Sequence, residues 1–104
     1  MTLERICSVG DVAPDSVARF DLGATSIAVA RIGDDWYAIG DRCSHQDVSL
    51  AEGELDVDDC SLECPKHGSC FSLSTGAPSS LPATRPVPTY VVRIDGTDVF
   101  VEVE

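Results

Sequence analysis

One stretch of this sequence decides how the rest is interpreted. Residues 41 to 76 read DRCSHQDVSLAEGELDVDDCSLECPKHGSCFSLSTG, and they hold four of the five cysteines and both histidines. Each histidine closely follows a cysteine, first as Cys43-Ser-His45 and then as Cys64-Pro-Lys-His67. Thiolate and imidazole are ligands for transition metals, and four of them on two turns are enough to enclose a metal centre. Cys43, His45, Cys64 and His67 are therefore the candidate metal ligands.

The distribution of the ligands over the two turns bears on the kind of metal. Structural zinc sites usually take two cysteines from one turn and two histidines from another. Here each turn supplies one cysteine and one histidine. The mixed arrangement suits a two-iron cluster in which both thiolates bind one iron and both imidazoles bind the other.

The sequence outside this stretch indicates an all-β domain. Short alternating runs bounded by Gly, Pro and Asp are typical of strands, and no window shows a helical period over three turns. The Asp95-Gly96 dipeptide is typical of a hairpin turn, and Gly33-Asp34-Asp35 predicts another. The predicted strands cover residues 4–9, 17–22, 25–32, 36–39, 90–94 and 98–103.

The domain organisation follows from where the cysteines lie. A chain of 104 residues makes one domain, so residues 1–104 are expected to fold together. Residues 41–76 are expected to form a site-bearing insertion between two sheet-forming parts, residues 1–40 and 77–104. The stretch from 77 to 89 holds four of the six prolines and predicts a stiff loop that covers the site and leads back to the sheet.

Charge and hydropathy exclude several classes of function. Eighteen acidic residues against seven basic ones give a net charge of −11. This balance argues against nucleic-acid binding and against docking on anionic lipid. No apolar run has the length of a membrane helix, and the first residues do not resemble a signal peptide. The expected compartment is the cytoplasm, where thiols stay reduced and cysteines serve as buried, catalytic or metal-binding residues.

At this point the sequence resembles the Rieske proteins. Cys43-Ser-His45 together with Cys64-Pro-Lys-His67-Gly-Ser69 is similar to the Rieske cluster motif. The likeness extends over nearly the whole chain, and the length matches the small Rieske-type ferredoxins. The flanking segments that also fit are Trp36-Tyr-Ala-Ile, Ser49-Leu-Ala-Glu-Gly53, Phe71-Ser-Leu-Ser-Thr-Gly76 and Pro88-Thr-Tyr-Val-Val.

The resemblance implies a fold, a cofactor and a role. It implies a Rieske-like arrangement of antiparallel β-sheets, with a 2Fe–2S cluster held by the four ligands in a small β subdomain. It also implies an electron carrier that is not itself an enzyme. The expected partners are a flavin-dependent ferredoxin reductase and the terminal non-haem iron oxygenase of a ring-hydroxylating dioxygenase system.

The departures from the family pattern concern the surroundings of the cluster. Rieske proteins of cytochrome complexes bridge the two ligand loops by a disulfide, and the matching positions here are Val48 and Lys66. Those proteins also donate hydrogen bonds to the cluster from a serine and a tyrosine, whereas this chain has Ser69 and Phe71. Because such hydrogen bonds raise the potential, we expect one towards the lower end of the Rieske range of about −150 to +300 mV.

Several features allow more than one interpretation. Lys66 is either a contact for a partner or an exposed filler, and Cys60 and Cys70 are either ordinary strand cysteines or a regulatory disulfide. The six acids between Glu52 and Glu63 form either a solvated connection or a docking face for basic redox partners. The alternative functions are a Rieske-type ferredoxin for iron–sulfur cluster assembly or another reductive pathway, and a structural Cys2His2 zinc module.

Overall fold

The computed structural model of the chain describes residues 2–22, 25–42, 49–65, 69–78 and 86–103. These residues form ten strands, arranged in three antiparallel sheets. The first sheet contains β1 (Thr2–Ser8), β10 (Asp98–Val103) and β9 (Val92–Asp95), in that order. The second contains β2 (Ser16–Leu22), β3 (Thr25–Ile32), β4 (Asp35–Gly40) and β8 (Thr89–Tyr90). The third contains β5 (Leu55–Asp56), β6 (Ser61–Glu63) and β7 (Cys70–Ser72).

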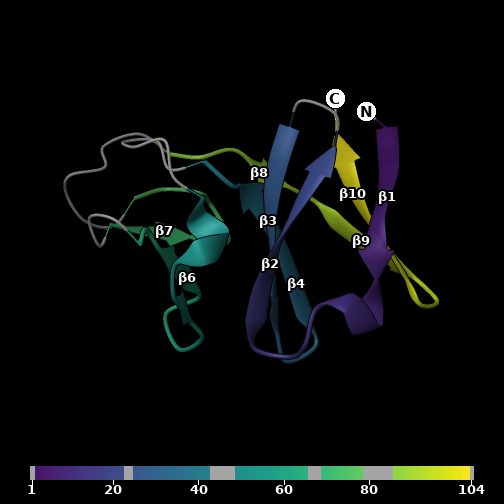
Figure 1. Cartoon of the computed structure of the whole chain (residues 1–104), viewed down its shortest axis with the longest axis horizontal. Helices are drawn as coiled ribbons and strands as arrows, with labels where there is room; N and C mark the ends of the chain where they lie inside the picture. Colours follow the sequence, from purple (N-terminus) through teal and green to yellow (C-terminus); the bar gives the residue numbers. More distant parts are fainter. Residues whose placement is uncertain (1, 23–24, 43–48, 66–68, 79–85, 104) are drawn as a thin grey trace.

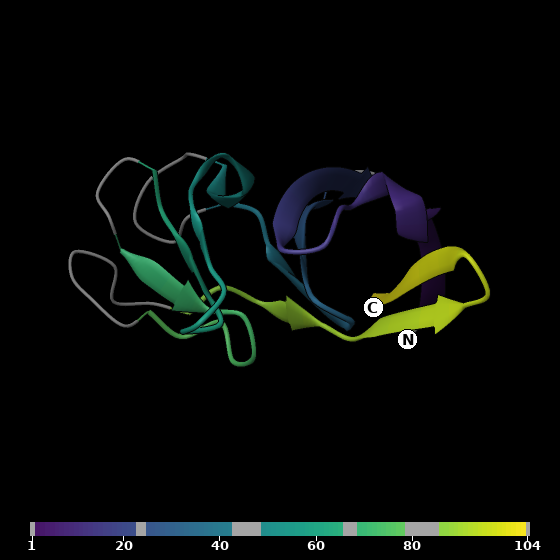
Figure 2. The same ribbon diagram turned by 90° about the horizontal axis from the view of Figure 1, so that it is seen from below.

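The three sheets lie as successive layers, with the sheet of β2, β3, β4 and β8 in the middle (Figure 1). Seen at right angles, the two larger sheets enclose one core while the small sheet lies to the side (Figure 2). Two short 3-10 turns, η1 (Val9–Asp11) and η2 (Leu50–Glu52), complete the described elements. In the described ranges no helix has the length and apolar character that crossing a membrane requires.

Strand β3 explains why the middle layer is buried on both sides. Four consecutive residues from Ile27 to Ala30 are fully buried, so successive side chains enter opposite cores. Ile27 and Val29 join the core between the two larger sheets, together with Val101 of β10. Ala28 and Ala30 face the other way, into a cluster that contains Leu62 of the small sheet. A strand covered on both faces has a continuous apolar run, as TSIAVARI does.

The predicted turns occur where the sequence placed them. Gly33 and Gly96 both have positive φ, 58° and 64°, which a glycine adopts without the strain that a side chain would cause. Gly33 begins the turn between β3 and β4, and Gly96 begins the turn between β9 and β10. The prediction of an all-β fold of antiparallel sheets is confirmed.

One predicted strand is divided between two sheets. The sequence favoured a single strand over residues 90–94, but β8 ends at Tyr90 and β9 begins at Val92. β8 pairs with β4, whereas β9 pairs with β10. Val91 lies between them with about half of its surface exposed (52%), and its carbonyl accepts a hydrogen bond from the Glu102 amide (2.9 Å). This segment therefore crosses from the middle sheet to the outer one.

Candidate metal centre

The residues that flank the first predicted ligand loop lie next to each other. Arg42 and Ser49 form an antiparallel bridge, and the Leu50 amide donates a hydrogen bond to the Asp41 carbonyl (2.6 Å). The segment 43–48, which carries Cys43 and His45, lies outside the described residues. The flanking residues 41–42 and 49–50 are joined by these contacts at the end of β4, and we call this pairing the neck of the loop.

The second predicted ligand loop connects β6 to β7. Cys64 follows β6 directly and is almost fully buried (1% exposed). Its amide donates a hydrogen bond to the carbonyl of Ser69 (2.7 Å), which closes the hairpin just above the last strand pair, Glu63 with Cys70. Residues 66–68, including Lys66 and His67, lie outside the described residues. The described part places the Cys64 thiol at the base of a tight turn.

The bases of the two loops meet in one hydrophobic cluster. Leu50, which follows the first loop, shares this cluster with Leu62, Cys64 and Phe71 from the second hairpin. Gly53 adds a direct backbone contact, because a Cβ at this position would lie 2.9 Å from the carbonyl carbon of Glu63. The φ of Gly53 is −84°, so close approach and not positive φ requires glycine here. The bases of both loops therefore meet where the small sheet packs against the middle sheet.

The described residues fit a cluster held between two loops. The Cys64 sulfur is buried beside apolar side chains, and the cysteines that the structure describes (Cys7, Cys60, Cys64 and Cys70) form no disulfide. Within these residues no three metal-binding side chains lie together, and three of the four predicted ligands, Cys43, His45 and His67, lie outside the described residues. Two closed necks, one buried thiol and a shared apolar base fit a cluster site, because an apolar shell limits the access of water to a metal centre.

The two predicted neighbours of the cluster that the structure describes are both buried. Ser69 is 1% exposed and Phe71 is fully buried, in the shared cluster. Phe71 faces Leu62 across the β6–β7 pair and forms a bridge with Pro78. Phe71 therefore contributes packing where the resemblance expected a hydroxyl.

The strand register separates Cys60 from Cys70. Glu63 pairs with Cys70, whereas the Cys60 carbonyl accepts the amide of Leu73 at the other end of the hairpin (2.9 Å). Three residue steps along a strand correspond to about 10 Å, beyond the reach of a disulfide. Cys60 is also not a strand cysteine, because it has a positive φ of 51° in the turn before β6.

Cys60 also contacts the middle sheet. The Tyr37 phenol of β4 has a raised pKa, first because of its hydrogen bond with Cys60.

Two thiols outside the predicted ligand set, Cys70 and Cys7, have raised pKa values. Burial raises the pKa of Cys70, and the nearby carboxylates of Glu63, Asp56 and Asp59 raise it further. Cys7, in β1, has a raised pKa chiefly because it is buried. Cys7 is 4% exposed and packs in a core cluster with Val12 and Val99, as a small apolar residue does.

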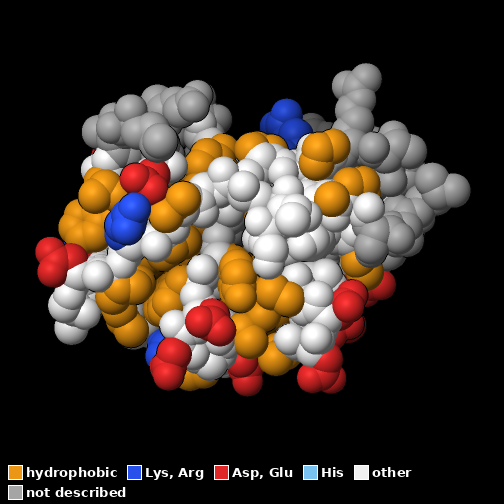
Figure 3. Space-filling view, turned by 180° about the vertical axis from the view of Figure 1, so that it is seen from behind, with side chains coloured by type: hydrophobic (Ala, Val, Ile, Leu, Met, Phe, Trp, Pro, Cys, Tyr) orange, Lys and Arg blue, Asp and Glu red, His pale blue; other side chains and the backbone are white. Residues whose placement is uncertain are grey.

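The acids of the small subdomain lie on its surface. Figure 3 shows acidic side chains gathered at the end of the molecule that carries the small sheet. Five of the six are exposed and Glu63 is half-buried, and the ranges 49–65 and 69–78 contain no Lys or Arg. Glu52, Glu54 and Glu63 also line a pocket of about 340 Å³ beside Cys64. The charged side chains of residues 49–65 and 69–78 are therefore all negative.

Asp41 is a residue of this region that the motif did not reveal. Asp41 lies two residues before Cys43, and it is only 2% exposed although it carries a carboxylate. Its Oδ1 accepts a hydrogen bond from the Ala51 amide (3.0 Å), across the neck of the first loop. The available signal was an acid between a predicted strand, residues 36–39, and the first predicted ligand, Cys43.

Comparison with known proteins agrees with this geometry. The Rieske [2Fe-2S] domain matches residues 2–91. The ferredoxin component of biphenyl 2,3-dioxygenase from Rhodococcus jostii (strain RHA1) is 42% identical over all of this chain and 95% of its own length. The ferredoxin of carbazole 1,9a-dioxygenase from Nocardioides aromaticivorans IC177 superposes with a TM-score of 0.94 at 35% identity, over 100% of both chains. The complex of reduced oxygenase and oxidized ferredoxin in carbazole 1,9a-dioxygenase contains a chain with a TM-score of 0.86 at 37% identity, covering 98% of this chain and 97% of that one.

These relatives confirm the role and the cofactor implied by the sequence. They are ferredoxin components of dioxygenases, so the chain is an electron carrier and not an enzyme, and its cofactor is a Rieske-type 2Fe–2S cluster. A structural zinc module does not agree with these matches. This chain therefore belongs to the Rieske [2Fe-2S] family.

Proposed function

We propose that this chain passes single electrons from a flavin-dependent reductase to the terminal non-haem iron oxygenase of a ring-hydroxylating dioxygenase system in the cytoplasm. The observation that carries the proposal is the convergence of two closed necks on one buried cluster of side chains around Cys64. A chain of the same fold, 37% identical, has been solved in complex with its oxygenase.

The proposed ligands are Cys43 and His45 from the first loop and Cys64 and His67 from the second. When bound, a 2Fe–2S cluster supplies a centre that takes up and releases one electron. The chain contributes the rest: the apolar base around Leu50 and Phe71 excludes water from the Cys64 side. Ser69 is the described hydroxyl nearest in sequence to the second loop, and we assign it to the cluster's surroundings.

The acidic end of the molecule supports docking on partners with basic faces. Exposed charges of one sign raise the rate of encounter with an oppositely charged surface, and salt screens this effect. Asp56 ends β5, and Asp58 and Asp59 lie on the turn between β5 and β6, on the same subdomain as Cys64.

The function is tested by reconstituting electron transfer. The purified holoprotein is mixed anaerobically with NADH and the flavin-dependent reductase of a biphenyl dioxygenase system, and then with the matching oxygenase. We expect the visible absorption of the ferredoxin to bleach when the reductase is added and to recover when the oxygenase is added. A holoprotein that neither accepts electrons from such reductases nor reduces such oxygenases would favour the alternative of a ferredoxin for cluster assembly or another reductive pathway.

The docking face is tested with two variants of equal charge change. D56N/D58N/D59N removes three charges from the small subdomain, whereas D34N/D35N/D95N removes three exposed charges from the hairpin tips of the larger sheets. At low ionic strength we expect the first variant to slow second-order reduction by about tenfold and the second to change it much less. Equal rates for both variants would contradict docking at the acidic end.

A further inference from the structure

Asp41 joins three segments of the chain at the neck of the first ligand loop. Its amide donates to the carbonyl of Ser26 on β3 (3.0 Å), and its carbonyl accepts the Leu50 amide (2.6 Å). Its side chain reaches further, because Oδ1 accepts the Ala51 amide (3.0 Å). One residue thus links the middle sheet to η2 on the far side of the loop.

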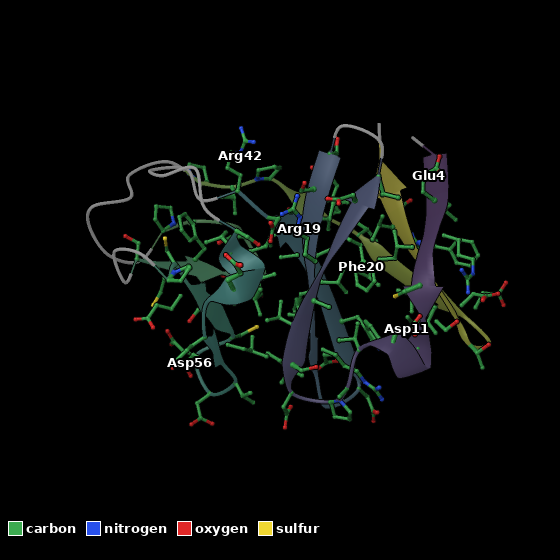
Figure 4. The ribbon with its side chains drawn as sticks, in the orientation of Figure 1. Glu4, Asp11, Arg19, Phe20, Arg42 and Asp56 are labelled. Carbon is green, nitrogen blue, oxygen red and sulfur yellow. The ribbon has the colours of Figure 1, made fainter. Side chains whose placement is uncertain are left out.

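The burial of this carboxylate requires an explanation. A buried charge costs free energy unless it is paired and hydrogen-bonded. Arg19 on β2 is the partner, with Nε 3.6 Å from Asp41 Oδ2, and Figure 4 shows its side chain directed towards this end of the middle sheet. Arg19 itself is half exposed (50%), so it only partly offsets the cost of burial.

Arg19 has a second acidic partner that offers a comparison. Its Nε also lies 3.2 Å from Oδ1 of Asp21, and its Nη2 donates to Ser26 Oγ (3.1 Å). Asp21 is exposed, and among the described residues its carboxylate accepts hydrogen bonds from Arg19 and Ser26 and not from Leu50 or Ala51. The two acids therefore share one arginine, but of the two only Asp41 bonds to residues that follow the first loop, Leu50 and Ala51.

Other contacts already fix the end of β4 in place. The Gly40 amide donates to the Pro88 carbonyl (2.8 Å), and a Cβ at Gly40 would lie 3.0 Å from the Pro88 ring. Leu50 is anchored by the shared hydrophobic cluster. The backbone of Asp41 and the shared hydrophobic cluster therefore already attach η2 to the middle sheet. The carboxylate adds one more hydrogen bond across the neck, to the amide of Ala51.

We propose that Asp41 is a positioning residue for the metal centre: its carboxylate, bonded to Ala51 across the neck, sets the loop that carries Cys43 and His45 against the Cys64 hairpin. The inference rests on the proposed ligand set. It assigns to Asp41 no contact with the cluster and no proton transfer.

The test compares variants that keep or remove the hydrogen bond. D41A and D41S are too short to accept the Ala51 amide, whereas D41N keeps an oxygen at the same place. D21A is the matched control, since it removes the exposed acid that shares Arg19. Each protein is purified anaerobically. Iron per chain, the EPR spectrum of the reduced protein and far-UV circular dichroism are then measured.

We expect D41A and D41S to keep the wild-type circular dichroism but to lose at least half of the iron or to broaden the EPR signal. D41N and D21A should retain about two irons per chain and wild-type line widths. Three results would overturn the proposal: a wild-type spectrum and iron content for both truncations, equal loss in D21A, or loss in D41N as large as in D41A. Failure of both truncations to fold would also overturn it, since the role of Asp41 would then be to support the fold. An iron-free wild-type protein would instead contradict the proposed cluster site.

Discussion

Gly53 lies directly against the backbone of Glu63, so that a Cβ on the glycine would fall 2.9 Å from the Glu63 carbonyl carbon and closer still to its oxygen. Gly53 ends η2, which follows the first ligand loop, and Glu63 precedes Cys64 of the second. This backbone contact sets the distance between the bases of the two loops.

The first prediction concerns this contact. We expect G53A to reduce stability by about 1–3 kcal/mol or more, because backbone atoms must move to admit the methyl group. G10A is the control, since nothing lies within 4 Å of a Cβ at Gly10. Thermal unfolding of the holoproteins measures the difference. A Tm for G53A equal to that of G10A would show that the contact relaxes without cost.

The second prediction separates the ligand cysteines from the other thiols. C43S and C64S should abolish the 2Fe–2S absorption and EPR signals, because a cluster with a missing thiolate is not retained. C60S and C70S should keep about two irons per chain, since neither residue belongs to the proposed ligand set: Cys60 lies at the other end of the hairpin from Cys64, and Cys70 pairs with Glu63. Iron analysis after anaerobic purification distinguishes the two pairs. Retention of the cluster in C64S would remove this residue from the ligand set.

The third prediction concerns the potential. Phe71 is fully buried and carries no hydroxyl, so F71Y introduces a hydrogen-bond donor beside the second loop. A donor to the cluster sulfurs stabilises the reduced state, so the midpoint potential of F71Y should move to more positive values. F20Y makes the same chemical change on β2 and should leave the potential unchanged. Protein-film voltammetry measures both. A wild-type value for F71Y would contradict the assigned role of this position.

The fourth prediction follows from the raised pKa of Cys70. A raised pKa means that less thiolate is present at any given pH, so alkylation of Cys70 should be slow below pH 9 and accelerate above it. E63Q removes one carboxylate that raises this pKa and should speed the reaction at pH 8. E4Q, on the exposed surface of β1, should not. Alkylation followed by mass spectrometry measures the rates, and equal rates in the two variants would exclude an effect of Glu63.

Sequence patterns predicted the larger sheets well because their strands are long and their turns are specific. The apolar run from Thr25 to Ile32 and the turns at Gly33 and Gly96 determine two hairpins locally. The small sheet was not predicted strand by strand. β5, β6 and β7 have only two or three residues each, in an acidic and cysteine-rich segment where period-2 alternation is too short to detect.

In the site, too, features set by neighbouring residues could be predicted, whereas features set by contacts between distant elements could not. The four ligand candidates follow from their spacing alone, whereas the burial of Asp41 depends on Arg19 and Ala51, which lie on other elements. The break at Val91 likewise depends on which sheet each neighbour joins. These features arise from tertiary packing, which a pattern of adjacent residues does not encode.

The hairpin of β9 and β10 has a practical consequence. Its turn lies at the opposite end of the long dimension of the molecule (39 Å) from the small sheet (Figure 1). Thr97 is exposed at this turn, where its carbonyl accepts a hydrogen bond from the Val9 amide (2.8 Å). A linker attached to the Thr97 side chain would fix the protein to an electrode or a bead with the small sheet, which carries the proposed cluster site, pointing outward and open to arriving partners.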